Sequence, residues 1–183
     1  VSHSIFNLLC TLLLLPMGGL LEKLVCTLVP DDKVPEVEAE LDERLLTTPA
    51  IALERCHDLT GEMAVCAIQT VYDALESLTG VTSELSEKVR KGEKQTDHLE
   101  DILASYLVKL SALPISSAES AEAAMLLKAI GDFERIADHG LNVLESAEEL
   151  TAKGLSFSSI AQKELSVLTA AVHEILSLSL HAF

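Results

Sequence analysis

The sequence is poor in the residues that sheets and tight turns require. It has no tryptophan, only 3% of its 183 residues are aromatic, and it contains eight glycines and five prolines. Strands favour aromatic and β-branched side chains, and hairpins need glycine or proline at their turns, so this composition argues against an all-β fold. The hydrophobic residues, 49% of the total, are enough to build the core of one domain.

Basic residues are also scarce. Thirteen Lys and Arg stand against 29 Asp and Glu, which gives a formal net charge of −16. We expect no nucleic-acid partner, because phosphate backbones are bound by clusters of Lys and Arg. A surface this acidic suits cations or basic partners.

The cysteines form no recognisable metal or redox motif. None of the four (Cys10, Cys26, Cys56 and Cys66) lies in a C-x-x-C pair, and their spacing fits no zinc signature. Cys56 and Cys66 lie among small apolar residues in a helical pattern. We expect both to be reduced thiols in a core, in a reducing compartment.

Residues 5–29 form a long hydrophobic stretch, interrupted only by Glu22 and Lys23. As a helix this stretch would reach about 37 Å, and the hydrocarbon core of a bilayer is about 30 Å thick. We therefore predict a transmembrane helix within residues 1–29, bent near Pro16. A secretory signal peptide and a buried helix of a soluble protein remain as alternatives.

Beyond this stretch, helix signals alternate with helix breakers. Apolar residues recur every three or four positions, and Thr48-Pro49, Pro114 and Lys153-Gly154 mark helix ends. The predicted segments are a linker over 30–48 that ends in a short helix, and helices over 49–78, 82–113, 116–152 and 158–183. Because no strand pattern appears and the connections are short, we predict an all-α antiparallel bundle.

The fourth predicted helix faintly repeats the first. Ile51, Ala52, Leu59 and Thr60 match Ile160, Ala161, Leu168 and Thr169 at one constant offset. The match predicts that residues 49–154 are a three-helix repeat and that residues 155–183 begin a second, truncated one.

Two acidic pairs are the strongest candidates for a binding site. Glu93 and Asp97 lie four residues apart on the second predicted helix, and Glu134 and Asp138 lie four apart on the third. Each pair shares one helix face, at the border of the apolar stripe. Carboxylates at this spacing repel one another unless a cation is bound, and their hard oxygens suit divalent ions. A solvated acidic rim is the alternative interpretation.

Catalysis has little support in the sequence. Glu54 and His57 form one Glu-x-x-His motif, the spacing of di-iron carboxylate bundles, but no other histidine has a glutamate three residues before it. Nucleotide-binding, hydrolase and metalloprotease motifs are also absent from the sequence. We therefore predict no catalytic residues, no organic cofactor and no enzyme activity, with a di-iron oxidase as the enzyme alternative.

The most specific stretch is residues 131–142, which read GDFERIADHGLN. It resembles the signature of the PhoU family, with Ala137 in place of the usual glycine. The stretch from Glu93 to Asp97 is similar to the companion motif of that family on the preceding helix. PhoU-like proteins are bundles of two three-helix repeats whose acidic motifs bind multinuclear metal clusters. The resemblance implies that Glu93, Asp97, Glu134 and Asp138 bind a divalent or multinuclear metal: iron, manganese, zinc or magnesium.

The amino-terminal stretch is similar to the last membrane segment of bacterial sodium/phosphate cotransporter family proteins. Phe6-Asn7-Leu8-Leu9 and the leucine run that ends at Pro16 carry this likeness. It implies a regulatory PhoU-like domain on the cytoplasmic side of the cell membrane. Its partners would be an upstream membrane transport domain and, through that domain, sodium and inorganic phosphate; a homo-oligomer is compatible with this arrangement. The alternative is a soluble PhoU-like adaptor that regulates a separate phosphate uptake or signalling system.

Overall fold

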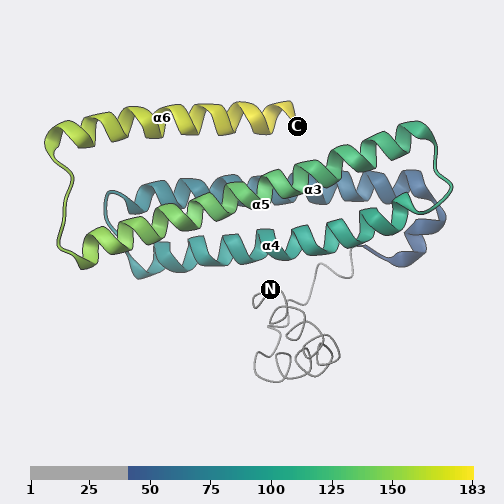
Figure 1. The fold of residues 1–183 in the computed structure, drawn as a ribbon, viewed down its shortest axis with the longest axis horizontal. Helices are drawn as coiled ribbons and strands as arrows, with labels where there is room; N and C mark the ends of the chain where they lie inside the picture. The colour runs from purple at the N-terminus through teal and green to yellow at the C-terminus, as the bar shows by residue number, and fades with distance from the viewer. Residues whose placement is uncertain (1–40) are drawn as a thin grey trace, which may run out of the picture. The chain divides into compact units, whose positions relative to one another are not determined.

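The computed structural model describes residues 41–183, and within them every regular element is a helix. The elements are a 3₁₀ helix η3 (Glu43–Thr47) and four α-helices: α3 (Pro49–Ser77), α4 (Ser83–Ser111), α5 (Ser117–Ala152) and α6 (Ser159–Ala182). Successive long helices run in opposite directions (Figure 1). The prediction of an all-α antiparallel bundle is confirmed. The predicted membrane helix within 1–29 and the start of the linker lie outside the described residues.

Short polar side chains fix where the helices begin. Thr82 accepts a hydrogen bond from the backbone of Leu85, and Ser158 accepts one from Ala161. Ser116 and Glu119 form a complete capping box at the start of α5. Thr48 occupies the N-cap of α3 without a side-chain hydrogen bond, so the start of α3 depends on Pro49 at its first position.

The end of α5 shows why one glycine is needed there. Gly154 has a φ of 64°, the left-handed conformation that residues with a Cβ adopt at a cost. In that conformation the Leu155 N–H bonds the carbonyl of Leu150, and the Gly154 N–H bonds that of Thr151. This hydrogen-bond pattern closes the helix as the Lys153-Gly154 signal predicts.

Helices α3, α4 and α5 enclose a main apolar core and a smaller cluster of Ala74, Val89 and Leu144. The largest fully buried side chains of the main core come from all three helices: Leu53, Leu59 and Met63 from α3, Leu103, Leu107 and Leu110 from α4, and Leu126 and Ile130 from α5. Cys56 is buried among them as a free thiol, and burial raises the pKa of this thiol to about 12. Cys66 is also a free thiol, but it is only half-buried. Cys56 therefore lies in the core as expected, whereas Cys66 lies at its edge.

Helix α6 lies along the bundle but buries none of its residues. The apolar stripe predicted for this helix consists of six residues: Ile160, Leu165, Leu168, Val172, Ile175 and Leu176. Leu165, Val172 and Leu176 are half-buried, whereas the other three side chains are 61–70% exposed. The stripe is only partly covered because α6 is apolar on both faces and only one of them meets the bundle. Among the described helices, α6 is the one long and apolar enough to be a candidate membrane span, with a mean hydropathy of 1.4.

Candidate functional site

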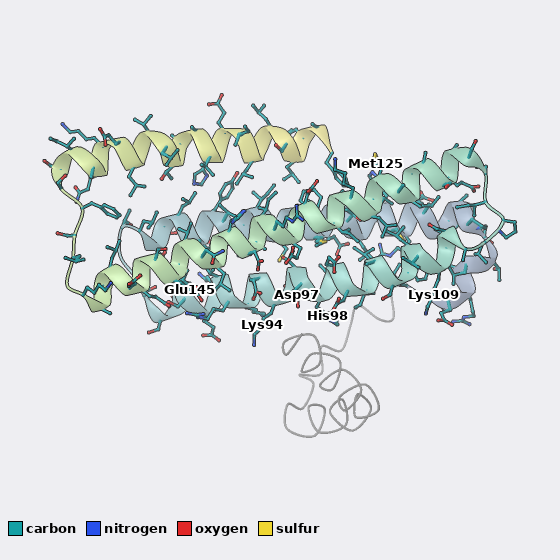
Figure 2. The ribbon with its side chains drawn as sticks, in the orientation of Figure 1. Lys94, Asp97, His98, Lys109, Met125 and Glu145 are labelled. Carbon is teal, nitrogen blue, oxygen red and sulfur yellow. The ribbon has the colours of Figure 1, made fainter. Side chains whose placement is uncertain are left out.

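The two acidic pairs lie on neighbouring helices. Glu93 and Asp97 lie on α4, Glu134 and Asp138 lie on α5, and α4 packs against α5 along the bundle. In each pair the first carboxylate is half-buried and the second is exposed, which agrees with a position at the border of the apolar stripe. Figure 2 shows Asp97 on α4 with Lys94 and His98 beside it.

The carboxylates of the two helices are close enough to perturb one another. Burial raises the pKa of Glu93, and the charges of Asp97 and of Asp138 on the neighbouring helix raise it further. Burial also raises the pKa of Glu134, followed by Asp138 on its own helix and by Asp97 across the helix interface. The four predicted residues therefore lie close enough for the charges of Asp97 and Asp138 to affect both glutamates.

A fifth carboxylate belongs to the same group. Glu100 raises the pKa of Glu134, and its own pKa is raised by burial and by the charges of Asp101 and Asp97. From the sequence alone we predict Glu100 to be a solvated surface residue, although its position three residues after Asp97 places it on the same helix face. We call Glu93, Asp97, Glu100, Glu134 and Asp138 the acidic patch.

The helices cross tightly below the acidic patch. A Cβ at Gly92 would lie 2.1 Å from the Thr70 hydroxyl of α3, and one at Gly140 would lie 3.3 Å from the Thr70 backbone. Thr70 is 2% exposed, and its hydroxyl donates to the Cys66 carbonyl at 2.9 Å. Because Glu93 follows Gly92 directly and Asp138 precedes Gly140 by two residues, this crossing holds the α4 and α5 carboxylates together.

The ligand atoms of the acidic patch suit a hard cation, but the distances between its side chains do not form a ready coordination site. Carboxylate oxygens are the ligands that divalent metals prefer. In residues 41–183, however, no three His, Cys, Asp or Glu side chains are arranged to hold a metal ion. A cation bound here would take fewer than three of the carboxylates directly, and water would fill the rest of its shell, as is usual for Mg²⁺.

The histidine of the Glu-x-x-His motif has a packing role on α3. The His57 ring stacks on the Phe183 ring at a centroid distance of 5.2 Å, and Phe183 also meets Phe133 edge to face at 5.4 Å. Glu54, His57, Glu119 and Glu122 line a small cavity of about 400 Å³, but they form no metal-binding group within the described residues. His57 thus connects Phe183 to the bundle.

Comparison with known proteins finds one similarity. The family model of the PhoU domain matches residues 60–147, which cover most of α3, all of α4 and most of α5. This part of the chain is therefore similar to a PhoU domain, and the match includes all five carboxylates of the acidic patch. PhoU domains are regulatory rather than catalytic and serve phosphate homeostasis, which fits the expectation of a non-enzyme. Searches of curated proteins and of solved structures found no match.

Proposed function

We propose that this chain is the regulatory part of a sodium-dependent transporter of inorganic phosphate. In this proposal, its bundle lies on the cytoplasmic side of the cell membrane and modulates a transport domain upstream. The observation that carries the proposal is the PhoU domain match over residues 60–147, because it connects the bundle with phosphate-related regulation. The hydrophobic stretch of residues 5–29 supports attachment to a membrane.

The acidic patch gives this proposal a mechanism. Carboxylates alone repel phosphate, whereas a divalent cation among them would present positive charge to it. Burial and then charge repulsion raise the pKa values of Glu93 and Glu134, and a bound cation would relieve the repulsion. In this mechanism, the transport domain contacts the bundle differently with and without the cation. The cation then binds one of these two arrangements more tightly, and the difference in its binding free energy shifts the equilibrium between them.

Phosphate uptake by cells tests the proposal. The chain is expressed together with its upstream membrane domain, and sodium-dependent uptake is measured across a range of phosphate and divalent-metal concentrations. We expect Glu134→Gln with Asp138→Asn to abolish the response of uptake to these concentrations while uptake itself persists. The control is Asp132→Asn with Glu145→Gln, which removes the same charge from exposed positions of the same helix. An unchanged response in the Glu134/Asp138 variant would contradict the proposal.

A soluble PhoU-like adaptor is the second candidate. The same domain match supports it, because a PhoU domain indicates a phosphate-related regulatory role in either setting. Fractionation separates the two candidates: a chain that stays with membranes after extraction at high pH supports the transporter, and a chain released by low-salt lysis supports the adaptor.

A further inference from the structure

A groove separates the first half of α6 from the bundle. It has a volume of about 990 Å³ and is bounded by the end of α3, the end of α5, the start of α6 and the turns that connect them. The Tyr72 and His173 rings stack at 3.9 Å, and the Tyr72 hydroxyl donates to the His173 carbonyl at 3.2 Å. These contacts join α3 to α6 at the end of the groove farthest from the turns. We call this space the α6 groove.

The walls of the α6 groove are mainly apolar. Six large hydrophobic side chains line it: Leu75, Leu78, Leu150, Leu155, Phe157 and Leu165. Several are half-buried or exposed, and Leu155 is 58% exposed. An apolar space of this size lies at the upper end of the range for small-molecule sites, which are usually lined by hydrophobic side chains with a few polar groups.

The charged groups of the α6 groove all have one sign. Asp73 and Glu76, one turn of α3 apart, are the only charged residues among the described residues that line it, and neither Lys nor Arg is present. Asp73 is half-buried and accepts a hydrogen bond from the Gln69 amide at 2.8 Å. Within residues 41–183, neither carboxylate forms an ion pair, because the neighbouring Lys88 ammonium is paired with Glu84 at 2.9 Å.

We propose that the α6 groove binds a small amphiphile that has an apolar body and a cationic amine head. The body would contact the leucines and Phe157, and the amine would pair with Asp73 and Glu76. A partner helix fits less well, because it is about 10 Å or more in diameter and α3 touches α6 at Tyr72 and His173. This proposal is independent of the acidic patch and of the proposed function.

Tyrosine resonances provide a local measurement of binding. The chain has two tyrosines: Tyr72 lines the groove, and Tyr106 is buried in the core at 4% exposure. The full chain is labelled with ¹³C-tyrosine in zwitterionic lipid nanodiscs and titrated with hexyltrimethylammonium or with hexyl sulfate. We expect hexyltrimethylammonium to shift Tyr72 to saturation and leave Tyr106 in place, and hexyl sulfate to shift neither.

Three variants test the assignment of the groove. Asp73→Asn with Glu76→Gln should weaken hexyltrimethylammonium about fivefold, as expected for the loss of two partly exposed charge pairs. Glu87→Gln with Asp132→Asn removes the same charge from exposed sites outside the groove and should leave the affinity unchanged. Ser166→Leu, which adds an apolar side chain inside the groove, should abolish the Tyr72 shift.

Other outcomes would overturn the proposal. Equal Tyr72 shifts with both probes would mean that the groove takes up any alkyl chain, without selection by charge. Equal weakening in the control variant would assign the effect to the overall charge of the protein. A Tyr72 shift produced by a basic amphipathic peptide, with no response to hexyltrimethylammonium, would make the groove a protein-docking surface instead.

Discussion

Gly92→Ala tests the tight crossing below the acidic patch. The added Cβ would lie 2.1 Å from the Thr70 hydroxyl, and 3.3 Å from the Thr70 Cβ even if the hydroxyl rotated away. Rotation would break the hydrogen bond from Thr70 to the Cys66 carbonyl. Overpacking of this kind costs about 1–3 kcal/mol, whereas alanine in place of glycine in a helix gains about 1 kcal/mol. We therefore expect a net loss of up to about 2 kcal/mol from the free energy of unfolding.

Urea unfolding of the full chain in a nonionic detergent, followed by far-ultraviolet circular dichroism, measures this loss. Gly61→Ala is the matched control, because Gly61 lies within α3 with no atom within 4 Å of its added Cβ. We expect Gly61→Ala to stabilise the protein by up to about 1 kcal/mol. In a Thr70→Ala background, Gly92→Ala should lose its cost, because the clashing hydroxyl is gone. Equal effects of Gly92→Ala and Gly61→Ala would refute the crossing described above.

Two further predictions concern the acidic patch. Mass spectrometry of the purified full chain should find bound iron, manganese, zinc or magnesium. This metal should be lost in the fourfold variant Glu93→Gln, Asp97→Asn, Glu134→Gln, Asp138→Asn. If neither protein contained metal, the acidic patch would be a solvated rim. Without metal, Glu93→Gln and Glu134→Gln should each raise the urea midpoint at pH 7. The native pKa of each glutamate is raised, so its ionisation opposes folding. This gain should vanish as the pH falls to about 4, below the ordinary pKa of a glutamate; a gain that persists there would refute the electrostatic cause.

The sequence was sufficient to predict the helices, because their ends carry local signals. Ser116 with Glu119 and Lys153 with Gly154 bracket α5 within a residue of the predicted ends. The buried residues of α4 and α5 lie on one face of each helix, as the apolar periodicity of the sequence predicts. Whether residues 49–154 and 155–183 are a repeat and the start of a second stays a prediction.

Packing partners were harder to predict than helices. Periodicity finds the apolar residues of α6 but cannot say which of its faces meets α3, so the predicted stripe includes Ile160 and Leu168, which are exposed. The role of Gly92 and Gly140 was missed for a related reason. A glycine within a helix pattern weakens the helix signal, and only the position of Thr70 on a third helix shows why a side chain would not fit.

The tight crossing also limits what a cation at the acidic patch could do. A Cβ added at Gly92 or Gly140 would lie 2.1 Å or 3.3 Å from Thr70, so α4 and α5 have little room to move closer to α3 there. Moving them apart would expose core leucines next to the crossing, such as Leu99 and Leu144, which are at most 3% exposed. The bundle is therefore rigid directly below its carboxylates. A bound cation would change the charge of this surface more than the shape of the bundle, and under the proposed function the transport domain would respond to that charge.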